Sequence, residues 1–189
     1  TGCEAIVHLA TVPGGAAESD PALAWQVNVD ATRTLFDAAA RASRPIRLVF
    51  ASSIAVFGDH LSTPLDEDAP VAPAMLYGAH KAMMETWLAA LGRRGSLHGM
   101  ALRLSGIVAR PAAPSGLKSA FLSELFHALR HKRAIDVPVS SDATTLLMSV
   151  DRAALNLVHA VESTLSGCVT LPATFVRMSD LADSIARQT

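Results

Sequence analysis

Tyr77 and Lys81 are spaced so that their side chains can act on one proton. They stand four residues apart in the segment Tyr77-Gly-Ala-His-Lys81, so on a helix they share one face. An ammonium beside a phenol favours the phenolate and lowers a tyrosine pKa that is ordinarily about 10. The pair therefore predicts a tyrosine that exchanges a proton near neutral pH.

Two serines precede this pair at the end of a predicted strand. Ser52 and Ser53 follow the apolar run Leu48-Val-Phe50, and a hydroxyl at a strand end could hold a reacting oxygen. Together with a tunable tyrosine, such a serine indicates redox chemistry at a carbon that carries a hydroxyl, which requires a hydride acceptor. Taken alone, Tyr-xxx-Lys is a common spacing, and a helical tyrosine is more often a packing residue.

Size and composition limit the functions to consider. The 189 residues suffice for one domain with a sizeable core. With 16 Lys+Arg against 17 Asp+Glu, nothing indicates a nucleic-acid partner, which requires clustered positive charge. No apolar run approaches the ~20 residues of a membrane helix, so no membrane partner is expected. Two cysteines without CxxC or zinc spacing indicate a reduced, cytoplasmic setting.

The order of predicted elements indicates an α/β fold. Strands are expected over residues 5–10, 46–51, 100–108, 135–139 and 169–171, and helices over residues 20–43, 77–92, 118–133, 151–162 and from Ser179. Continuous rather than alternating apolar strands are typical of a parallel sheet covered on both faces. We predict a Rossmann-like doubly wound parallel sheet, with about residues 106–149 contributing to a smaller substrate-binding region.

The glycine-rich turn of dinucleotide-binding folds does not occur in this sequence. Its 11 glycines never form GxGxxG or GxxGxxG, and Gly92-Arg-Arg-Gly95 falls at a predicted helix end, as a C-cap and turn would. We therefore expect residues 1–189 to be one Rossmann-type domain, incomplete at its N-terminus and internal to a longer protein. We also expect these residues by themselves to bind NAD weakly or not at all.

Several motifs, in order, resemble the extended short-chain dehydrogenases/reductases of the NAD-dependent epimerase/dehydratase superfamily. His8-Leu-Ala10 matches the strand end that passes the cofactor. Asn28-Val-Asp-Ala-Thr32 resembles the family's N-V-x-G-T, with Ala31 where glycine is usual.

The resemblance continues through the residues that could do chemistry. Leu48-Val-Phe-Ala-Ser-Ser53 with Val56-Phe-Gly58 resembles the serine strand and its V-Y-G, with phenylalanine in place of tyrosine. Tyr77-Gly-Ala-His-Lys81 is the YxxxK pair, and Leu102-Arg-Leu104 matches the strand after the catalytic helix. Each motif is weak alone, whereas the ordered set is specific.

Within the superfamily the chain most resembles D-erythronate dehydrogenase-like proteins. The details are Ser-Ser-Ile-Ala-Val-Phe-Gly58, Lys81-Ala-Met83, Ala101-Leu-Arg-Leu-Ser105, Val108-Ala-Arg-Pro111 and Leu147-Met-Ser149. The resemblance implies NAD-dependent oxidation of the C2 hydroxyl of a small sugar acid. A nucleotide-sugar epimerase/dehydratase or a carbonyl reductase stays open as an alternative, as does a non-catalytic NAD(P)-binding regulatory protein.

The resemblance implies a role for each matching residue. Tyr77 is the expected acid/base, Lys81 lowers its pKa and binds the nicotinamide ribose, and Ser53, five residues before Gly58, orients the substrate oxygen. The other expected cofactor contacts are Leu9, Ala10, Thr11, Asn28, Ser52 and Leu104. The other expected substrate contacts are Thr11, Ser105, Ser119, residues 112–116 and Arg110, whose guanidinium suits a carboxylate.

The sequence leaves open the role of Asn28, the choice between NAD and NADP, and the oligomeric state. Asn28 is either a support near the cofactor or Lys81, or a solvent-facing or capping residue. NADP is not excluded, because the residue that selects the cofactor follows the family's second strand. A homodimer through the helices over residues 20–43 and 77–92 is expected by analogy.

The remaining polar and aromatic residues have ordinary structural explanations. No metal site is expected, because His127 and His131 lack a third ligand at a suitable spacing and stand among basic residues. His80 is expected to be a variable residue on a helix face, and residues 66–68 a solvated loop. Trp25 and Trp87 are expected in the core or at an interface.

Overall fold

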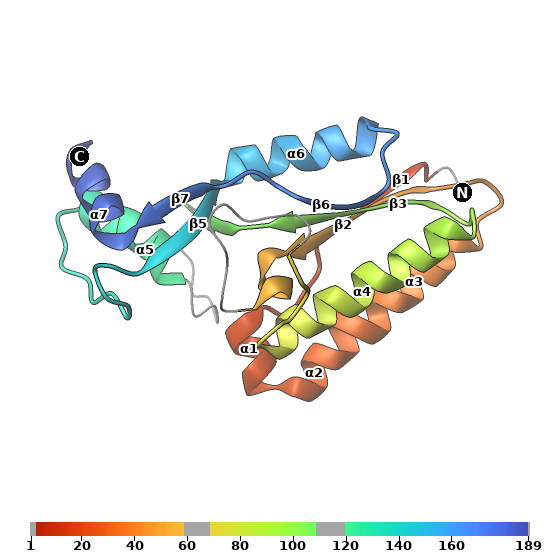
Figure 1. The fold of residues 1–189 in the computed structure, drawn as a ribbon, viewed down its shortest axis with the longest axis horizontal. Coiled ribbons are helices and arrows are strands. Elements are labelled where there is room, and N and C mark those ends of the chain that lie inside the picture. Colours follow the sequence, from red (N-terminus) through yellow and green to blue (C-terminus); the bar gives the residue numbers. More distant parts are fainter. Residues whose placement is uncertain (1–2, 59–68, 109–119, 189) are drawn as a thin grey trace. The chain divides into compact units, whose positions relative to one another are not determined.

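The computed structural model describes residues 3–58, 69–108 and 120–188, which form two compact units (Figure 1). The first unit comprises Thr1–Leu104 and Leu155–Leu171, and the second comprises Ser105–Ala154 and Pro172–Thr189. Within the described ranges, none of the helices is long and apolar enough to cross a membrane. The predicted loop over residues 66–68 and three expected substrate contacts lie outside the described residues: Arg110, Ser119 and residues 112–116.

The first unit is built on a four-stranded sheet in the order β1-β2-β3-β6. Its strands are β1 (Ala5–His8), β2 (Arg47–Ser53), β3 (His98–Leu104) and β6 (Gly167–Thr170). All three neighbouring pairs are parallel. Six of the seven residues of β2 are buried, of which the apolar run Leu48 to Ala51 predicts four and the polar Arg47 and Ser52 are the other two. The predicted α/β fold with a parallel sheet is confirmed.

Helices cover both faces of this sheet (Figure 1). One face is covered by α3 (Thr32–Ala40) and α4 (Leu76–Arg93), and the other by the part of α6 (Val150–Glu162) that belongs to this unit. The buried Arg47 of β2 ties α6 to the sheet, because its Nε and Nη2 donate to the carbonyl of Ala160 at 2.9 and 2.6 Å. Helices therefore lie on both faces, as is typical of a parallel sheet, and the central strands β2 and β3 are the most buried.

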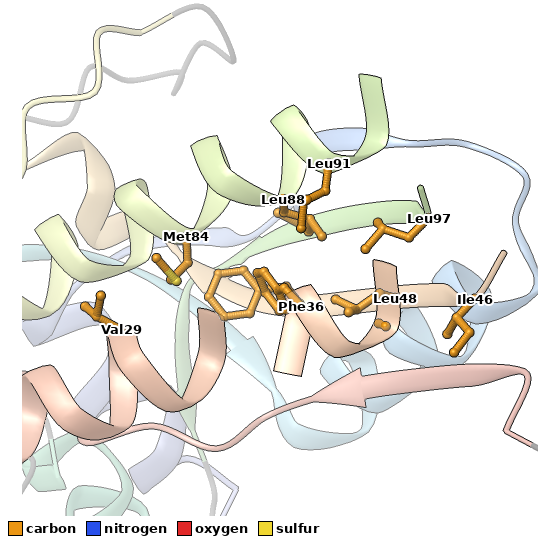
Figure 2. Close-up of a cluster of buried hydrophobic side chains, with 11 residues drawn as sticks. Val29, Phe36, Ile46, Leu48, Met84, Leu88, Leu91 and Leu97 are labelled. Atoms are coloured by element: carbon orange, nitrogen blue, oxygen red, sulfur yellow. The ribbon is translucent and has the colours of Figure 1, made fainter. Parts of the chain in front are cut away.

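The core of the first unit lies between the sheet and the helices α3 and α4 (Figure 2). Leu48 and Phe50 are two residues apart on β2, so their side chains lie on the same face, toward these helices. The ring of Phe36 meets that of Phe50 edge to face, with centroids 5.4 Å apart. From α4, Met84, Leu88 and Leu91 complete the cluster at helical spacing.

The helical region before β2 departs from the prediction of one regular helix. It begins as expected, because the Asp20 side chain accepts a hydrogen bond from Leu23 N at 3.0 Å, with proline at the first turn. It then passes from α2 (Pro21–Trp25) through a π-helical segment, η1 (Gln26–Ala31), into α3. A short helix, α1 (Gly14–Ser19), precedes it and was not predicted, since its glycines and alanines carry no amphipathic pattern.

The second unit has its own three-stranded sheet in the order β4-β5-β7. Its elements are β4 (Gly106–Val108), α5 (Ala120–Arg130), β5 (Thr144–Ser149), β7 (Thr174–Arg177) and α7 (Met178–Ala186). β4 pairs with β5 in parallel, whereas β5 and β7 are antiparallel. Its core is the buried cluster Val108, Leu122, Leu125, Leu147, Met178 and Ile185.

The predictions were less accurate in the second unit. The strand expected over residues 100–108 is two strands in different sheets, separated at Ser105. Residues 135–139 form no strand, and β5 and β7 were not predicted. Both missed strands are only partly buried and carry threonine and serine, so they lack a continuous apolar run. The last helix begins at Met178, one residue before the expected cap.

Candidate active site

Ser53, Tyr77 and Lys81 come together at the carboxyl end of β2. Ser53 is the last residue of that strand, is half-buried, and forms a side-chain hydrogen bond with Tyr77. Lys81, one helical turn after Tyr77 on α4, has its Nζ 5.5 Å from the centre of the tyrosine ring. The Lys81 Nζ also donates to the carbonyl of Ala51 on β2, at 2.7 Å.

Gly78 allows α4 to approach the serine strand this closely. After Ser53 the chain forms one 3-10 turn, η2 (Ile54–Phe57), whose first free N–H, on Ala55, donates to Ser53 Oγ at 3.2 Å. A Cβ on Gly78 would lie 2.3 Å from the carbonyl oxygen of Ala55, so only glycine fits. The helix therefore packs backbone to backbone on η2, which sets Tyr77 beside Ser53.

Gly58 ends the turn that follows the serine. Its φ of +82° lies in the region that favours glycine, and a Cβ there would meet the carbonyl oxygen of Ala72 at 2.3 Å. The glycine of the V-F-G motif is thus required by both conformation and space.

The pKa of Tyr77 differs from the expectation. Burial raises this pKa above its usual 10, while the hydrogen bond with Ser53 lowers it, and the net shift is upward. The net shift is therefore opposite to the lowering of the Tyr77 pKa expected from Lys81, because burial disfavours the charged phenolate. In the structure the tyrosine is therefore a phenol at neutral pH.

Burial destabilises the charged form of Lys81. The side chain is 3% exposed, and burial lowers its pKa from 10.5 to about 8, although the negative charge of Glu85 raises it. Its Nζ also lies 4.6 Å from the centre of the Phe50 ring, a cation–π contact. Lys81 is therefore charged below about pH 8 and loses that charge within a pH range accessible to enzymes.

Asn28 holds the segment that follows β1. It is 4% exposed, and its Oδ1 accepts from Val12 N at 2.7 Å and from Thr11 Oγ1 at 3.0 Å, while its Nδ2 donates to Val12 O at 2.9 Å. Asn28 is therefore buried and not solvent-facing, and its role near the cofactor or Lys81 stays a prediction. Asn28 lies in the π-helical segment η1, and such segments are frequent at functional sites.

This anchoring leaves Leu9 and Ala10 exposed just beyond the carboxyl end of β1, with Thr11 half-buried beside them. Ligands of open parallel sheets bind at this edge. Leu104, at the end of β3, is paired in register with Ser53 and reaches the same edge.

Two expected contacts have buried side chains. Ser52 is 2% exposed and its hydroxyl donates to Glu85 at 2.5 Å, so this side chain faces α4. Ser105, which belongs to the second unit, is 7% exposed, and the described residues provide no hydrogen-bond partner for its hydroxyl.

His80 was wrongly expected on a variable helix face. It is 4% exposed, its ring meets that of Trp25 edge to face at 5.7 Å, and its Nδ1 lies 3.5 Å from Asn28 Nδ2. Burial lowers the pKa of His80, while Glu18 raises it. The apolar stripe of α4 runs back from Leu88 and Met84 to position 80, and that spacing was the signal available in the sequence.

The structure also shows the surroundings of the two tryptophans and the end of α4. Trp25 and Trp87 are 46% and 39% exposed, so neither is a core residue. Gly92 to Gly95 form the expected helix end, where Ser96 N donates to Leu91 O and Gly95 N to Gly92 O. Within the part of the chain that the structure describes, no cluster of three metal-ligating side chains occurs.

Comparison with known proteins follows the same motifs. The family described as "NAD dependent epimerase/dehydratase family" matches residues 1–164. The chain belongs to this family. The matched residues include Ser53, Tyr77 and Lys81, and they end before β6.

Individual relatives refine this picture. The chain is 31% identical to a D-erythronate dehydrogenase of Haemophilus influenzae over 159 residues, and 35% identical to one of Cupriavidus necator over 158 residues. Each match covers 84% of this chain but only 50% and 49% of the relative, so the chain spans about half of their length. A solved nucleoside-diphosphate-sugar epimerase from Agrobacterium tumefaciens is 30% identical, with a TM-score of 0.84 over 93% of this chain and 54% of that one.

We expect Gly78→Ala to separate α4 from η2, because its Cβ would enter the space of the Ala55 carbonyl. Unfolding should become easier by about 1–3 kcal/mol, and turnover should fall by up to ~100-fold as Tyr77 moves from Ser53. The matched control is Gly92→Ala on the same helix, where the nearest atom would be at 3.9 Å and stability should hold or rise. Urea unfolding and steady-state kinetics measure both, and equal behaviour of the two variants would contradict the close-packing argument.

We also expect Lys81 to make stability depend on pH. Its pKa is about 8 when folded and 10.5 ordinarily, so the unfolded chain holds more protons in between and unfolding becomes harder as pH rises. From about pH 7 to about pH 9.5 the free energy of unfolding should gain about 2 kcal/mol from this residue. Above about pH 10, the raised pKa of Tyr77 acts in the opposite sense.

Lys81→Met should remove this gain, whereas Lys132→Met, at an exposed lysine, should keep it. Denaturant unfolding at a series of pH values measures the difference. An unchanged pH dependence in Lys81→Met would show that the ammonium is not desolvated as described.

Proposed function

We propose that this chain forms the catalytic part of an NAD-dependent dehydrogenase that oxidises the C2 hydroxyl of a small sugar acid such as D-erythronate. The observation that carries the proposal is the convergence of Ser53, Tyr77 and Lys81 at one strand end. Family membership and the two D-erythronate dehydrogenase relatives support the substrate class. Since those relatives are about twice as long, the activity proposed is that of the complete protein.

The donors of Lys81 suit a nicotinamide nucleotide. An ammonium has three N–H donors, and among the described residues the structure gives Lys81 one hydrogen bond, to Ala51. The remaining donors match ribose hydroxyls. The exposed Leu9 and Ala10, with Thr11 and Leu104, would line the cofactor at the same edge of the sheet. When bound, the cofactor supplies the acceptor for the hydride that leaves the substrate carbon.

The protein residues handle the proton in this proposal. Ser53 is fixed by the N–H of Ala55 and by Tyr77, so its hydroxyl can orient the substrate oxygen. Tyr77 takes the hydroxyl proton as the carbon–oxygen bond becomes a carbonyl. Because burial raises the Tyr77 pKa, the phenolate that accepts this proton needs the Lys81 ammonium as its counter-charge.

The remaining contacts also belong to the proposal. Arg110 and Ser105 would bind the substrate carboxylate and hydroxyls. NAD is proposed over NADP because the matching family is described as NAD dependent. A cytoplasmic setting is also proposed, because two cysteines without CxxC or zinc spacing indicate a reduced environment.

A homodimer through α2 and α4 is proposed on the apolar side chains that these helices expose. They are Leu23, Trp25, Leu76, Met83 and Trp87. Exposed large apolar and aromatic side chains are enriched at protein interfaces.

A nucleotide-sugar epimerase is the second candidate. It is favoured by the structural likeness to the Agrobacterium tumefaciens epimerase at 30% identity. A non-catalytic regulatory role is disfavoured, because the protein retains a hydrogen-bonded Ser53–Tyr77 pair beside a buried ammonium.

The complete protein is expected to form NADH with four-carbon 2-hydroxy sugar acids, and to epimerise UDP-glucose or UDP-galactose at a negligible rate. NADH absorbance measures the first reaction and chromatography of the nucleotide sugars the second. Turnover of UDP-sugars without oxidation of any sugar acid would replace the proposal with the second candidate.

A further inference from the structure

A buried cluster of polar side chains lies between the strands β2 and β3 and the helix α4, which carries Tyr77 and Lys81. Ser52, Glu85 and Arg103 are 2%, 8% and 9% exposed, and none of them was expected to interact with the others. Buried charges are expensive unless they are paired and hydrogen-bonded, so such a cluster calls for a physical explanation.

The fold brings these three residues together by strand register. Ser52 on β2 is paired with Arg103 on β3, so both side chains point to the same face of the sheet, where α4 lies. Glu85 descends from α4 between them. Ser52 Oγ donates to Glu85 Oε1 at 2.5 Å. Arg103 Nη2 donates to Oε2 at 2.9 Å and its Nε to Oε1 at 3.1 Å.

These hydrogen bonds fix both oxygens of the Glu85 carboxylate. Arg103 binds both oxygens in the fork arrangement that guanidinium and carboxylate prefer, and it also lies over the Phe57 ring, 4.7 Å from the ring centre. Phe57 belongs to η2, the turn that fixes Ser53. The cluster therefore connects α4, two strands and the serine turn.

Glu85 also acts on Lys81. It stands four residues, or one helical turn, after Lys81 and so lies on the same face of α4. Among the described residues, the charged and titratable groups that interact with the Lys81 ammonium are Tyr77 and Glu85 from α4 and His8 from β1, and Glu85 is in turn paired with Arg103 from β3. Of these, Glu85 is the anion whose field opposes the burial of the ammonium.

We propose that Glu85, gripped by Arg103 and Ser52, is a positioning residue that serves as the fixed counter-ion of Lys81. It keeps the ammonium charged and directed at Tyr77, and it does so without contact with substrate or cofactor. Ser52 thus acts through Glu85, while the adjacent Ser53 faces the reacting groups. The catalytic meaning of this arrangement rests on the proposed function, whereas the electrostatic coupling does not.

The test is an NMR titration of Lys81 in the complete protein, with lysine labelled at ¹³Cε and the resonance assigned by its loss in Lys81→Met. We expect the wild-type midpoint near pH 8 and a fall of about one pH unit in Glu85→Gln, which keeps the shape of the side chain and removes its charge. The control, Thr86→Ala, changes the neighbouring exposed residue and should leave the midpoint unchanged.

A second variant guards against misfolding. Glu85→Gln/Arg103→Met leaves no unpaired buried guanidinium, and its Lys81 midpoint should also lie below that of the wild type. An unchanged midpoint in the folded variants would overturn the proposal.

Activity separates this inference from the proposed function. If Lys81 serves the chemistry, the basic limb of the kcat/KM profile in Glu85→Gln should move to lower pH by the same amount as the midpoint. A shifted midpoint in a protein without dehydrogenase activity would reject the proposed function and uphold the role of Glu85. An unshifted midpoint would reject that role whatever the activity.

Discussion

The ammonium of Lys81 is buried at the carboxyl end of β2, and the site is arranged around the cost of keeping a charge there. Burial alone lowers its pKa toward the working range of an enzyme. The Ala51 carbonyl, the Phe50 ring and the Glu85 carboxylate each offset part of that cost. Burial also raises the Tyr77 pKa, so the tyrosine is a neutral phenol over the pH range in which Lys81 is charged.

Close backbone packing brings Tyr77 and Lys81 to Ser53. Gly78 permits the contact between α4 and η2, and Gly58 closes the turn that presents Ser53. On the other side, Asn28 uses three hydrogen bonds to hold the segment after β1 at the same edge of the sheet. Different residues therefore set the approach of α4 to Ser53, the charge of Lys81 and the position of the segment after β1.

The sequence predicted those parts of the fold and site that local patterns determine. Unbroken apolar runs predicted β2 and the parallel sheet, and the Tyr77–Lys81 spacing predicted a shared helix face. Contacts between distant elements left no local signal: the Ser52–Glu85–Arg103 cluster depends on strand register, and the upward shift of the Tyr77 pKa depends on burial. The half-polar strands β5 and β7 were missed because only tertiary packing distinguishes them from loops.

In the proposed function, Tyr77 is the group that exchanges the substrate proton. Tyr77→Phe in the complete protein removes one oxygen and leaves Lys81, Glu85 and the ring packing in place. The direct measurement is NADH formation from the sugar acid by this variant, with NAD affinity determined by calorimetry. We predict that turnover falls ~10²–10⁴-fold while NAD binding is retained. Turnover equal to that of the wild type would contradict the account.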